Sequence, residues 1–181
     1  APLVDGLADR LRHRGLLVFG PGSDGARLEG SKAWMKEVLV EAGVPTAQYG
    51  AFTDRAAAQA FLDQLDGLFV VKTDGLAAGK GVLVTGDRAE ADAAVAAYLS
   101  GDAFGDAGRR VVIEQGLTGP ELSVLAVCDG TTAVPLAPAQ DFKRLGDRDL
   151  GPNTGGMGAY SPVPVATERL VDDLMEEAIL P

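Results

Sequence analysis

The residues most able to do chemistry lie in the segment 69–85, whose sequence is FVVKTDGLAAGKGVLVT. Lys72 ends a predicted strand, and Lys80 lies in the small-residue loop that follows it. The loop carries three glycines, Gly75, Gly79 and Gly81. Glycines let backbone N–H groups approach a polyphosphate closely, and the two lysines would neutralise its charge. We therefore predict a nucleotide-phosphate site in a glycine-rich tip between two strands, in preference to a surface hairpin with incidental lysines.

This loop is not a P-loop of the Walker A type. That motif needs four residues between its glycines and then Lys followed by Ser or Thr, which holds Mg²⁺. Here three residues separate Gly75 from Gly79, and Gly81 follows Lys80. The apolar run after the loop predicts a strand rather than the helix that a P-loop opens. The pattern favours a hairpin that covers phosphates.

Residues 20–25, GPGSDG, match the G-x-G-x-x-G fingerprint of dinucleotide-binding proteins. A lone match of this kind is weak, and Pro21 lacks the N–H that a pyrophosphate would accept from. The next helix is expected to begin only near Ser31, and no strand ending in an acid lies about 20 residues on. We predict a plain turn, and a dinucleotide-dependent oxidoreductase remains a third-ranked alternative.

A second candidate site begins at Glu114-Gln115-Gly116-Leu117 and includes Glu121. An extended linker between two strands could match the edge of adenine with its backbone groups, while Leu117 packs on the base. The carboxylate of Glu121 could accept hydrogen bonds from both ribose hydroxyls. A hairpin with surface acids is about equally consistent with these residues.

The segment 139–165 is expected to be a long loop, and structureless loops of more than ~12–15 residues are usually functional or disordered. Lys143 and Arg144 offer cationic donors for a phosphate or carboxylate. A polar, glycine-rich series follows them: Asn153, Thr154, Gly155, Gly156 and Met157. These residues predict substrate binding, although a solvated basic pair and a glycine hinge are the alternative.

Composition restricts the possible partners. The chain has 181 residues and a net charge of −10, which argues against nucleic acid or an anionic membrane because both need a basic face. The single cysteine, Cys128, excludes an internal disulfide and is expected to be a buried thiol in a reducing compartment. The single histidine, His13, is expected at the surface, so neither a Ser–His–Asp set nor a zinc site is predicted.

Periodicity predicts a mixture of helices and strands that would hold these residues in place. The second predicted helix carries Lys36, which is expected on its outer face. Hinges are expected near 44–46 and 115–117. Helices are predicted over 2–14, 31–42, 53–65, 87–99 and from Thr167, and strands over 16–19, 69–72, 81–85, 111–114, 121–128 and 132–138.

Together these motifs resemble the ATP-grasp ligases and, more closely, the phosphoribosylamine–glycine ligase family, also called glycinamide ribonucleotide synthetases. Any one motif would indicate only the superfamily, but LEGSK, DGLAAGKGV and GPNTGGMGAYSP together are specific. The similar segments cover nearly the whole chain: 19–21, 28–36, 43–49, 70–84, 104–123 and 140–165.

The resemblance implies ATP-driven amide formation in purine biosynthesis. In this family the glycine carboxylate attacks the γ-phosphate of ATP and becomes an acyl phosphate. The amine of phosphoribosylamine then displaces phosphate, which gives glycinamide ribonucleotide, ADP and phosphate. The protein contributes positioning and charge stabilisation rather than covalent catalysis.

The resemblance also implies residue roles. Lys32 and Lys72 would contact the ATP phosphates, and the loop 75–81 with Lys80 would cover them. Residues 114–117 would hold adenine, and Glu121 would hold ribose. The predicted catalytic residues are Lys72, Lys80 and Arg144. The predicted substrate residues are Asp141, Lys143, Arg144, Asn153, Thr154, Gly155, Gly156 and Met157.

The implied fold is α/β with an α+β lid, an ATP-grasp fold that this chain contains incompletely. Residues 1–44 would be the end of a preceding α/β domain and a linker helix, 45–115 the lid, and 116–181 the first part of the central domain. The family's Mg²⁺ ligands, a Glu and an Asn near the motif EFN-x-RFGDPE, are expected beyond residue 181. The chain begins with Ala1 rather than Met, so we expect a fragment. We expect this fragment to be inactive alone, because it could not complete the metal site.

We expect the whole protein to be a cytoplasmic monomer that acts on small molecules. One alternative is another ATP-grasp ligase that joins a carboxylate to an amine, since the superfamily elements would be the same. The other is a nucleotide-binding module without catalysis, which the absent metal ligands would permit for this chain.

Overall fold

The structure is a computed structural model that describes residues 2–77, 81–102, 104–148 and 150–181, with the backbone alone for Asp106, Pro152 and Asn153. The chain divides into two compact units. The first unit consists of Ala1–Glu41 with Thr46–Leu117, and the second unit of Ala42–Pro45 with Thr118–Pro181. Among the described residues, no helix is both long and apolar enough to span a membrane. The predicted division at 44/45 and 115/116 into three domains stays a prediction.

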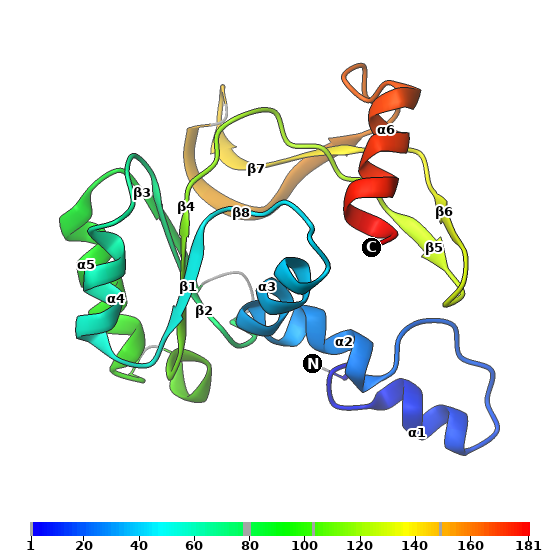
Figure 1. Cartoon of the computed structure of the whole chain (residues 1–181), viewed down its shortest axis with the longest axis horizontal. Coiled ribbons are helices and arrows are strands. Elements are labelled where there is room, and N and C mark those ends of the chain that lie inside the picture. The colour runs from blue at the N-terminus through cyan, green and yellow to red at the C-terminus, as the bar shows by residue number, and fades with distance from the viewer. Residues whose placement is uncertain (1, 78–80, 103, 149) are drawn as a thin grey trace. The chain divides into compact units, whose positions relative to one another are not determined.

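The first unit is built on a four-stranded antiparallel sheet with the order β1–β4–β2–β3 (Figure 1). Its strands are β1 (Tyr49–Phe52), β2 (Phe69–Thr73), β3 (Val82–Thr85) and β4 (Val111–Gln115). Burial alternates along β2, so Val71 and Lys72 point to opposite faces of the sheet. Val71 lies opposite Ile113 in the register and Val70 lies opposite Glu114. The sheet therefore has one apolar face and one face that carries charge.

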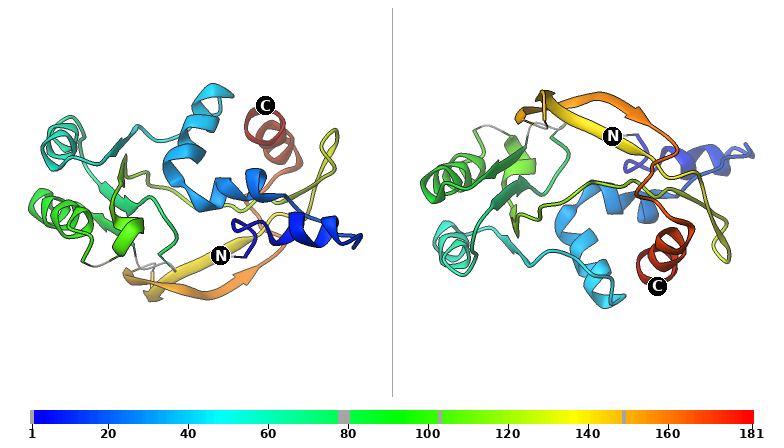
Figure 2. Two further views of the ribbon diagram at one scale, coloured as in Figure 1. Left: turned by 90° about the horizontal axis from the view of Figure 1, so that it is seen from below. Right: turned by 90° about the horizontal axis from the view of Figure 1, so that it is seen from above.

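Two helices cover the apolar face of this sheet, α4 (Arg55–Leu62) and α5 (Arg88–Leu99), which lie side by side in Figures 1 and 2. The carboxylate of Asp87 accepts a hydrogen bond from Ala89 N–H at 2.8 Å, so the predicted cap of α5 is confirmed. The cap of α4 is Asp54, one residue after the predicted Thr53. The buried core between helices and sheet consists of Ala58, Leu62, Leu65, Phe69, Val71, Ala91, Val95, Val111 and Ile113.

Helix α3 (Lys32–Glu41) contacts β1 and lies on the other side of the sheet from α4 and α5 (Figure 1). The hydroxyl of Ser31 accepts a hydrogen bond from Trp34 N–H at 3.1 Å, which confirms the predicted cap of this helix. Two helices precede it, α1 (Leu7–His13) and α2 (Ser23–Gly30).

Two predictions for the N-terminal part are wrong. Residues 16–19 do not form a buried strand. They are not part of the four-stranded sheet of the first unit, and the residues Leu17 and Phe19 are 104% and 81% exposed. A helix begins at Ser23 rather than first near Ser31, so the glycine turn at 20–25 does lead into a helix. The strand that a dinucleotide fingerprint needs before that turn is nevertheless missing.

The second unit contains two β-hairpins and a C-terminal helix. In the first hairpin β5 (Ala126–Cys128) pairs with β6 (Ala133–Pro135), and in the second β7 (Gln140–Gly146) pairs with β8 (Leu150–Tyr160). Helix α6 (Glu168–Leu174) is capped by Thr167, as predicted, and continues as a π-helix over Met175–Ile179.

The prediction of a long loop at 139–165 is therefore wrong, because most of this segment forms the β7–β8 hairpin. Its strands are rich in glycine and mostly exposed, so they lack the apolar alternation by which a strand is recognised. The predicted strands 121–128 and 132–138 are shorter than expected. Cys128 is exposed rather than buried, because the β5–β6 hairpin leaves its side chain uncovered.

We expect Val95→Ala in α5 to lower the free energy of unfolding by about 2 kcal/mol, because Val95 is fully buried in the core. Val40→Ala in α3 is the matched control, since that valine is 57% exposed and also lies in a helix. Its effect should stay within about 0.5 kcal/mol. Urea unfolding followed by circular dichroism measures both, and equal losses would contradict the core assignment.

Candidate active site

The charged face of the first unit's sheet holds a carboxylate between two lysines. Glu114 on β4 lies 2.6 Å from Lys72 Nζ through Oε1 and 2.9 Å from Lys36 Nζ through Oε2. Burial raises the pKa of Glu114, but the hydrogen bonds from Lys72 and Lys36 outweigh this effect, so its pKa lies below the ordinary 4.5. Two ammonium groups share one carboxylate, which leaves the cluster one positive charge in excess.

Lys36 was expected on an outer helix face, and this prediction is wrong. The residue is 4% exposed, and its ammonium also donates a hydrogen bond to Thr46 Oγ1 at 2.6 Å. Lys36 follows Ala33 by three residues and Lys32 by four, which places all three near one stripe of α3. That spacing was the available signal, but a lysine on a helix is usually read as solvent-exposed.

Lys72 is the more open of the two lysines, with 24% of its side chain exposed against 5% for Lys36. It stands on β2 diagonally across from Glu114, because Val70 is the residue that lies directly opposite Glu114. The predicted phosphate lysine is therefore fixed by a strand and an ion pair, and part of its side chain still faces outward.

Lys32 lies at the first turn of α3, next to the end of β2. Its ammonium donates hydrogen bonds to the carbonyl oxygens of Thr73 at 2.8 Å and Gly75 at 3.1 Å. Burial is the main cause that lowers the pKa of Lys32, and the positive charge of Lys72 lowers it further, against an opposing effect of Asp74. The structure thus brings Lys32 close enough to Lys72 for their charges to interact.

Asp74 holds this arrangement together, and sequence reasoning missed its role. Its carboxylate accepts hydrogen bonds from Ala33 N–H at 2.7 Å and from Ser31 Oγ at 3.0 Å, both at the start of α3. Arg110 pairs with the same carboxylate at 3.7 Å. A carboxylate at a helix N-terminus satisfies unpaired N–H groups and the helix dipole. Asp74 therefore ties α3, and Lys32 with it, to the glycine loop.

Two glycines of the loop are required by close packing. A Cβ added to Gly75 would lie 2.7 Å from the Cβ of Ala107 in the short 3₁₀ helix Gly105–Gly108. A Cβ added to Gly81 would lie 2.8 Å from that of Ala77. Either contact would force a shift, since real Cβ atoms essentially never approach so closely. Gly79 and Lys80, predicted to lie over the phosphates, fall outside the described residues.

The predicted adenine segment follows directly from β4. Gln115 N–H donates to Gln48 O at 2.9 Å and Gly116 N–H donates to Leu68 O at 2.7 Å, so these two donors are occupied within the unit. The side chain of Leu117 is 72% exposed. Adenine recognition here stays a prediction. Because these two N–H groups are already bonded, the backbone groups left to contact adenine are the carbonyl groups and those of Leu117.

In the second unit three predicted residues meet. Lys143 Nζ lies 3.1 Å from Glu121 Oε2 and 2.9 Å from Asp141 Oδ2. Hydrogen bonds with Asp141 and then Glu121 raise the pKa of Lys143, so it stays protonated to higher pH than an ordinary lysine. The cluster is largely open to solvent, and its one cation stands between two carboxylates.

The other predicted substrate residues lie along the β7–β8 hairpin. Arg144 donates a hydrogen bond to Gly151 O at 3.3 Å. Thr154 Oγ1 donates to Lys143 O at 2.8 Å and accepts from Gly156 N–H at 3.0 Å, which fixes the backbone near Gly155. Met157 is 55% exposed, and Asn153 is described by its backbone alone. A substrate role for these residues stays a prediction.

The described residues offer no complete metal site built from protein groups alone. They contain no group of three or more His, Cys, Asp or Glu residues that could hold a metal ion. In the first unit, both oxygens of Glu114 are occupied by lysines. The expectation that the metal ligands lie beyond residue 181 stays a prediction.

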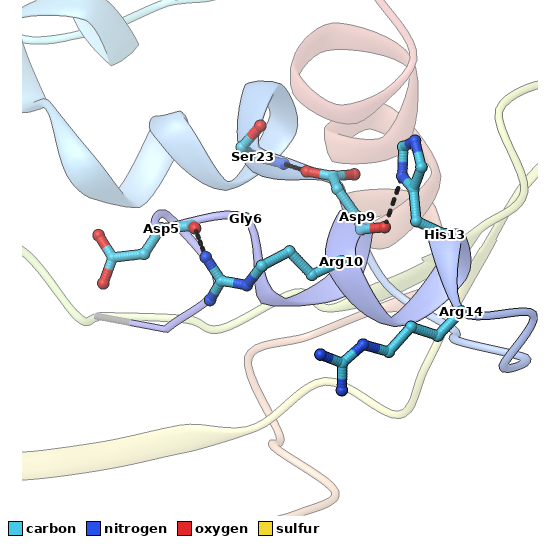
Figure 3. Close-up of a pocket in the computed structure, with 7 residues that line it drawn as sticks. All are labelled: Asp5, Gly6, Asp9, Arg10, His13, Arg14 and Ser23. Atoms are coloured by element: carbon cyan, nitrogen blue, oxygen red, sulfur yellow. Dashed lines mark hydrogen bonds between the residues drawn. The ribbon is translucent and has the colours of Figure 1, made fainter.

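A separate hollow of about 460 Å³ lies in the first unit near α1 (Figure 3). There Asp9 accepts a hydrogen bond from Ser23 N–H at 2.8 Å, which lowers the pKa of Asp9, and Arg10 donates to Asp5 O at 2.8 Å. His13 also lies in the hollow and is exposed, as predicted. None of the predicted site residues lines this hollow, and we assign it no role.

Residues 30–181 match the family described as phosphoribosylglycinamide synthetase, ATP-grasp (A) domain. The chain belongs to this family. The predicted ATP-grasp fold and the family resemblance are thereby confirmed. The match includes α3, the sheet, the glycine loop and the β7–β8 hairpin, so all the candidate residues described above lie inside it.

Named relatives agree with this assignment. The chain is 53% identical over 180 residues to a phosphoribosylamine–glycine ligase of Mesorhizobium japonicum. This alignment covers 99% of this chain and 42% of that protein. The crystal structure of phosphoribosylamine–glycine ligase from Thermotoga maritima aligns with a TM-score of 0.79 at 36% identity, over 90% of this chain and 42% of the other. A biotin carboxylase from Campylobacter jejuni shares the fold alone, with a TM-score of 0.74 at 20% identity over 95% of this chain and 38% of the other. The chain thus spans less than half the length of these proteins.

The lowered pKa of Glu114 predicts how stability depends on pH. Because the folded state binds its proton less tightly than the unfolded state, the stabilisation is present above pH 4.5 and is lost as the pH falls below it. Glu114→Gln should therefore be less stable than the wild type near neutral pH, and the difference should shrink below pH 4.5. Urea unfolding at a series of pH values measures this, and a difference that persists unchanged in acid would contradict the ion-pair account.

Proposed function

We propose that this chain forms the ATP-binding part of a phosphoribosylamine–glycine ligase. The observation that carries the proposal is the family match over residues 30–181, together with the 53% identity to a ligase of that name over nearly the whole chain. The reaction joins glycine to 5-phosphoribosylamine, with ATP as the energy source, in de novo purine biosynthesis.

The reaction runs in two steps. A carboxylate oxygen of glycine attacks the γ-phosphorus of ATP, the bond to the bridging oxygen breaks, and ADP leaves with that electron pair. The amine nitrogen of phosphoribosylamine then attacks the acyl carbon, and phosphate leaves while the nitrogen loses a proton. Negative charge accumulates on phosphate oxygens in both steps, so fixed positive charge is the protein's main means of catalysis.

In the first unit, Lys72 supplies such a charge to the phosphates. Its partner Glu114 is also neutralised by Lys36, so the cluster keeps a net positive charge in a chain of −10 overall. Lys32 would join it by exchanging the carbonyl oxygens of Thr73 and Gly75 for phosphate oxygens. We assign Lys80 and the glycines Gly75, Gly79 and Gly81 to covering the phosphates.

In the second unit, we assign Lys143 and Arg144 to the anionic groups of the substrates. The backbone at Thr154–Gly156 would supply N–H donors to a small carboxylate, and its position is fixed by the bonds of Thr154. Glu121 would accept hydrogen bonds from ribose, with its charge balanced by Lys143. In the first unit, residues 114–117 would hold adenine.

The proposal includes a cytoplasmic monomer that uses ATP with Mg²⁺. No step is assigned to the metal, because no cluster of three metal ligands lies among the described residues. The cytoplasmic location is supported by the demand for ATP, and the acidic composition is consistent with small-molecule rather than nucleic-acid partners.

The deciding measurement is ADP release by the full-length gene product with ATP, glycine and phosphoribosylamine in the presence of Mg²⁺. We expect turnover only when both substrates are present, because the acyl phosphate needs glycine and its consumption needs the amine. Other amino acids and amines serve as controls. Turnover with a different acid or amine would favour another ATP-grasp ligase, and ATP binding without turnover under any pair would favour a binding module.

Lys72→Met should raise the KM for ATP of the full-length enzyme by about tenfold or more, because it removes the partly exposed positive charge of the phosphate site. Arg55→Met is the matched control, since it removes the same charge from the exposed start of α4. Steady-state ADP release at varied ATP gives both values. Equal KM values for the two variants would contradict the assignment of Lys72.

A further inference from the structure

We propose that Lys36 is a positioning residue for ATP, which acts on the phosphate lysine Lys72 through the carboxylate of Glu114. The inference rests on the proposed function. Its basis is the chain of contacts from Lys36 Nζ to Glu114 Oε2 at 2.9 Å and from Glu114 Oε1 to Lys72 Nζ at 2.6 Å.

Lys36 does not contact ATP itself. It is 4% exposed, and its ammonium donates to Glu114 and to Thr46 Oγ1, with the ring of Tyr49 at 5.5 Å. Its groups are therefore satisfied inside the protein. Lys72 retains 24% exposure and is the member of the cluster from which a phosphate can accept a hydrogen bond.

The charges explain what Lys36 does. Lys72 and Glu114 alone would form a neutral pair, and a neutral pair attracts a phosphate only weakly. The second ammonium, from Lys36, balances the carboxylate, so that the positive charge of Lys72 is left uncompensated. The effect is strong because the contacts are short and Glu114 and Lys36 are shielded from water.

Lys36 also fixes where Lys72 lies. Lys36 holds the second oxygen of Glu114, so the carboxylate cannot rotate freely and keeps its first oxygen directed at Lys72. Thr46 Oγ1 and the N-terminal bonds of α3 hold Lys36 in turn. A buried ion pair with several hydrogen bonds of this kind has a defined geometry.

The test is Lys36→Met in the full-length enzyme, because methionine keeps the length of the side chain and removes the charge. We expect ATP to bind on the order of tenfold more weakly by titration calorimetry, with the KM for glycine unchanged. Adenosine, which has no phosphates, should bind as it does to the wild type. Arg55→Met, an equal charge loss at an exposed site, should leave ATP binding unaltered.

A double variant separates charge from packing. Lys36→Met with Glu114→Gln removes one positive and one negative charge, so Lys72 again carries the only net charge of the cluster. We expect this double variant to bind ATP more tightly than Lys36→Met alone, and Lys36→Arg to bind nearly as the wild type. A purely structural role for Lys36 predicts no such recovery, because the second substitution removes a further buried contact.

The outcomes are distinct. Recovery of ATP binding in the double variant, among variants that unfold cooperatively on heating, supports the proposal. Wild-type-like binding by Lys36→Met, or no recovery in a folded double variant, overturns it. If Lys36→Met fails to fold, Lys36→Gln and Lys36→Gln with Glu114→Gln take the place of the two variants and are judged by the same outcomes. If the wild-type enzyme turns over ATP and Lys36→Met binds ATP as tightly as the wild type, this inference alone is overturned. If the wild-type enzyme does not bind ATP, the proposed function is overturned as well.

Discussion

The site in the first unit depends on one buried carboxylate. Glu114 stands on a central strand, and removal from water would be costly for its charge unless partners replaced the lost hydration. Lys72 comes from the neighbouring strand and Lys36 from helix α3, so satisfying this one group joins three elements. The same requirement fixes the face that α3 presents to the sheet, and with it the position of Lys32 at the start of that helix.

The sheet can carry this cluster because the alternation of a strand separates two tasks. Val71 and Ile113 face α4 and α5 and form the apolar core, while Lys72 and Glu114 on the same two strands face the other side. Mainly apolar packing therefore holds these strands in place, and the charged face is supported by their rigidity. A functional group placed on such a scaffold is located more accurately than one on a loop.

Sequence reasoning succeeded where the signal is local. The two strands around the glycine loop and the caps at Ser31, Asp87 and Thr167 follow from neighbouring residues, and the structure has them. It failed where burial is decided by distant parts of the chain. Lys36 is buried because Glu114 lies 78 positions away in sequence and needs a second partner, which no pattern within α3 reveals. The β7–β8 hairpin is not predicted from the sequence for a related reason. Its two strands are defined by backbone pairing with each other, and their side chains do not show the apolar alternation of a strand.

Stability is a poor explanation for two lysines around one carboxylate. Buried ion pairs are often no more stabilising than apolar residues of similar size, and a second lysine adds repulsion between like charges. The arrangement does keep a fixed positive charge beside the glycine loop of an acidic protein. Salt screens charges beyond about 8 Å at physiological ionic strength, so the overall charge of −10 would act weakly on a phosphate already in contact with Lys72. A protein of this composition can thus bind an anion through a local excess of charge, which its folded structure provides by sharing Glu114 between Lys36 and Lys72.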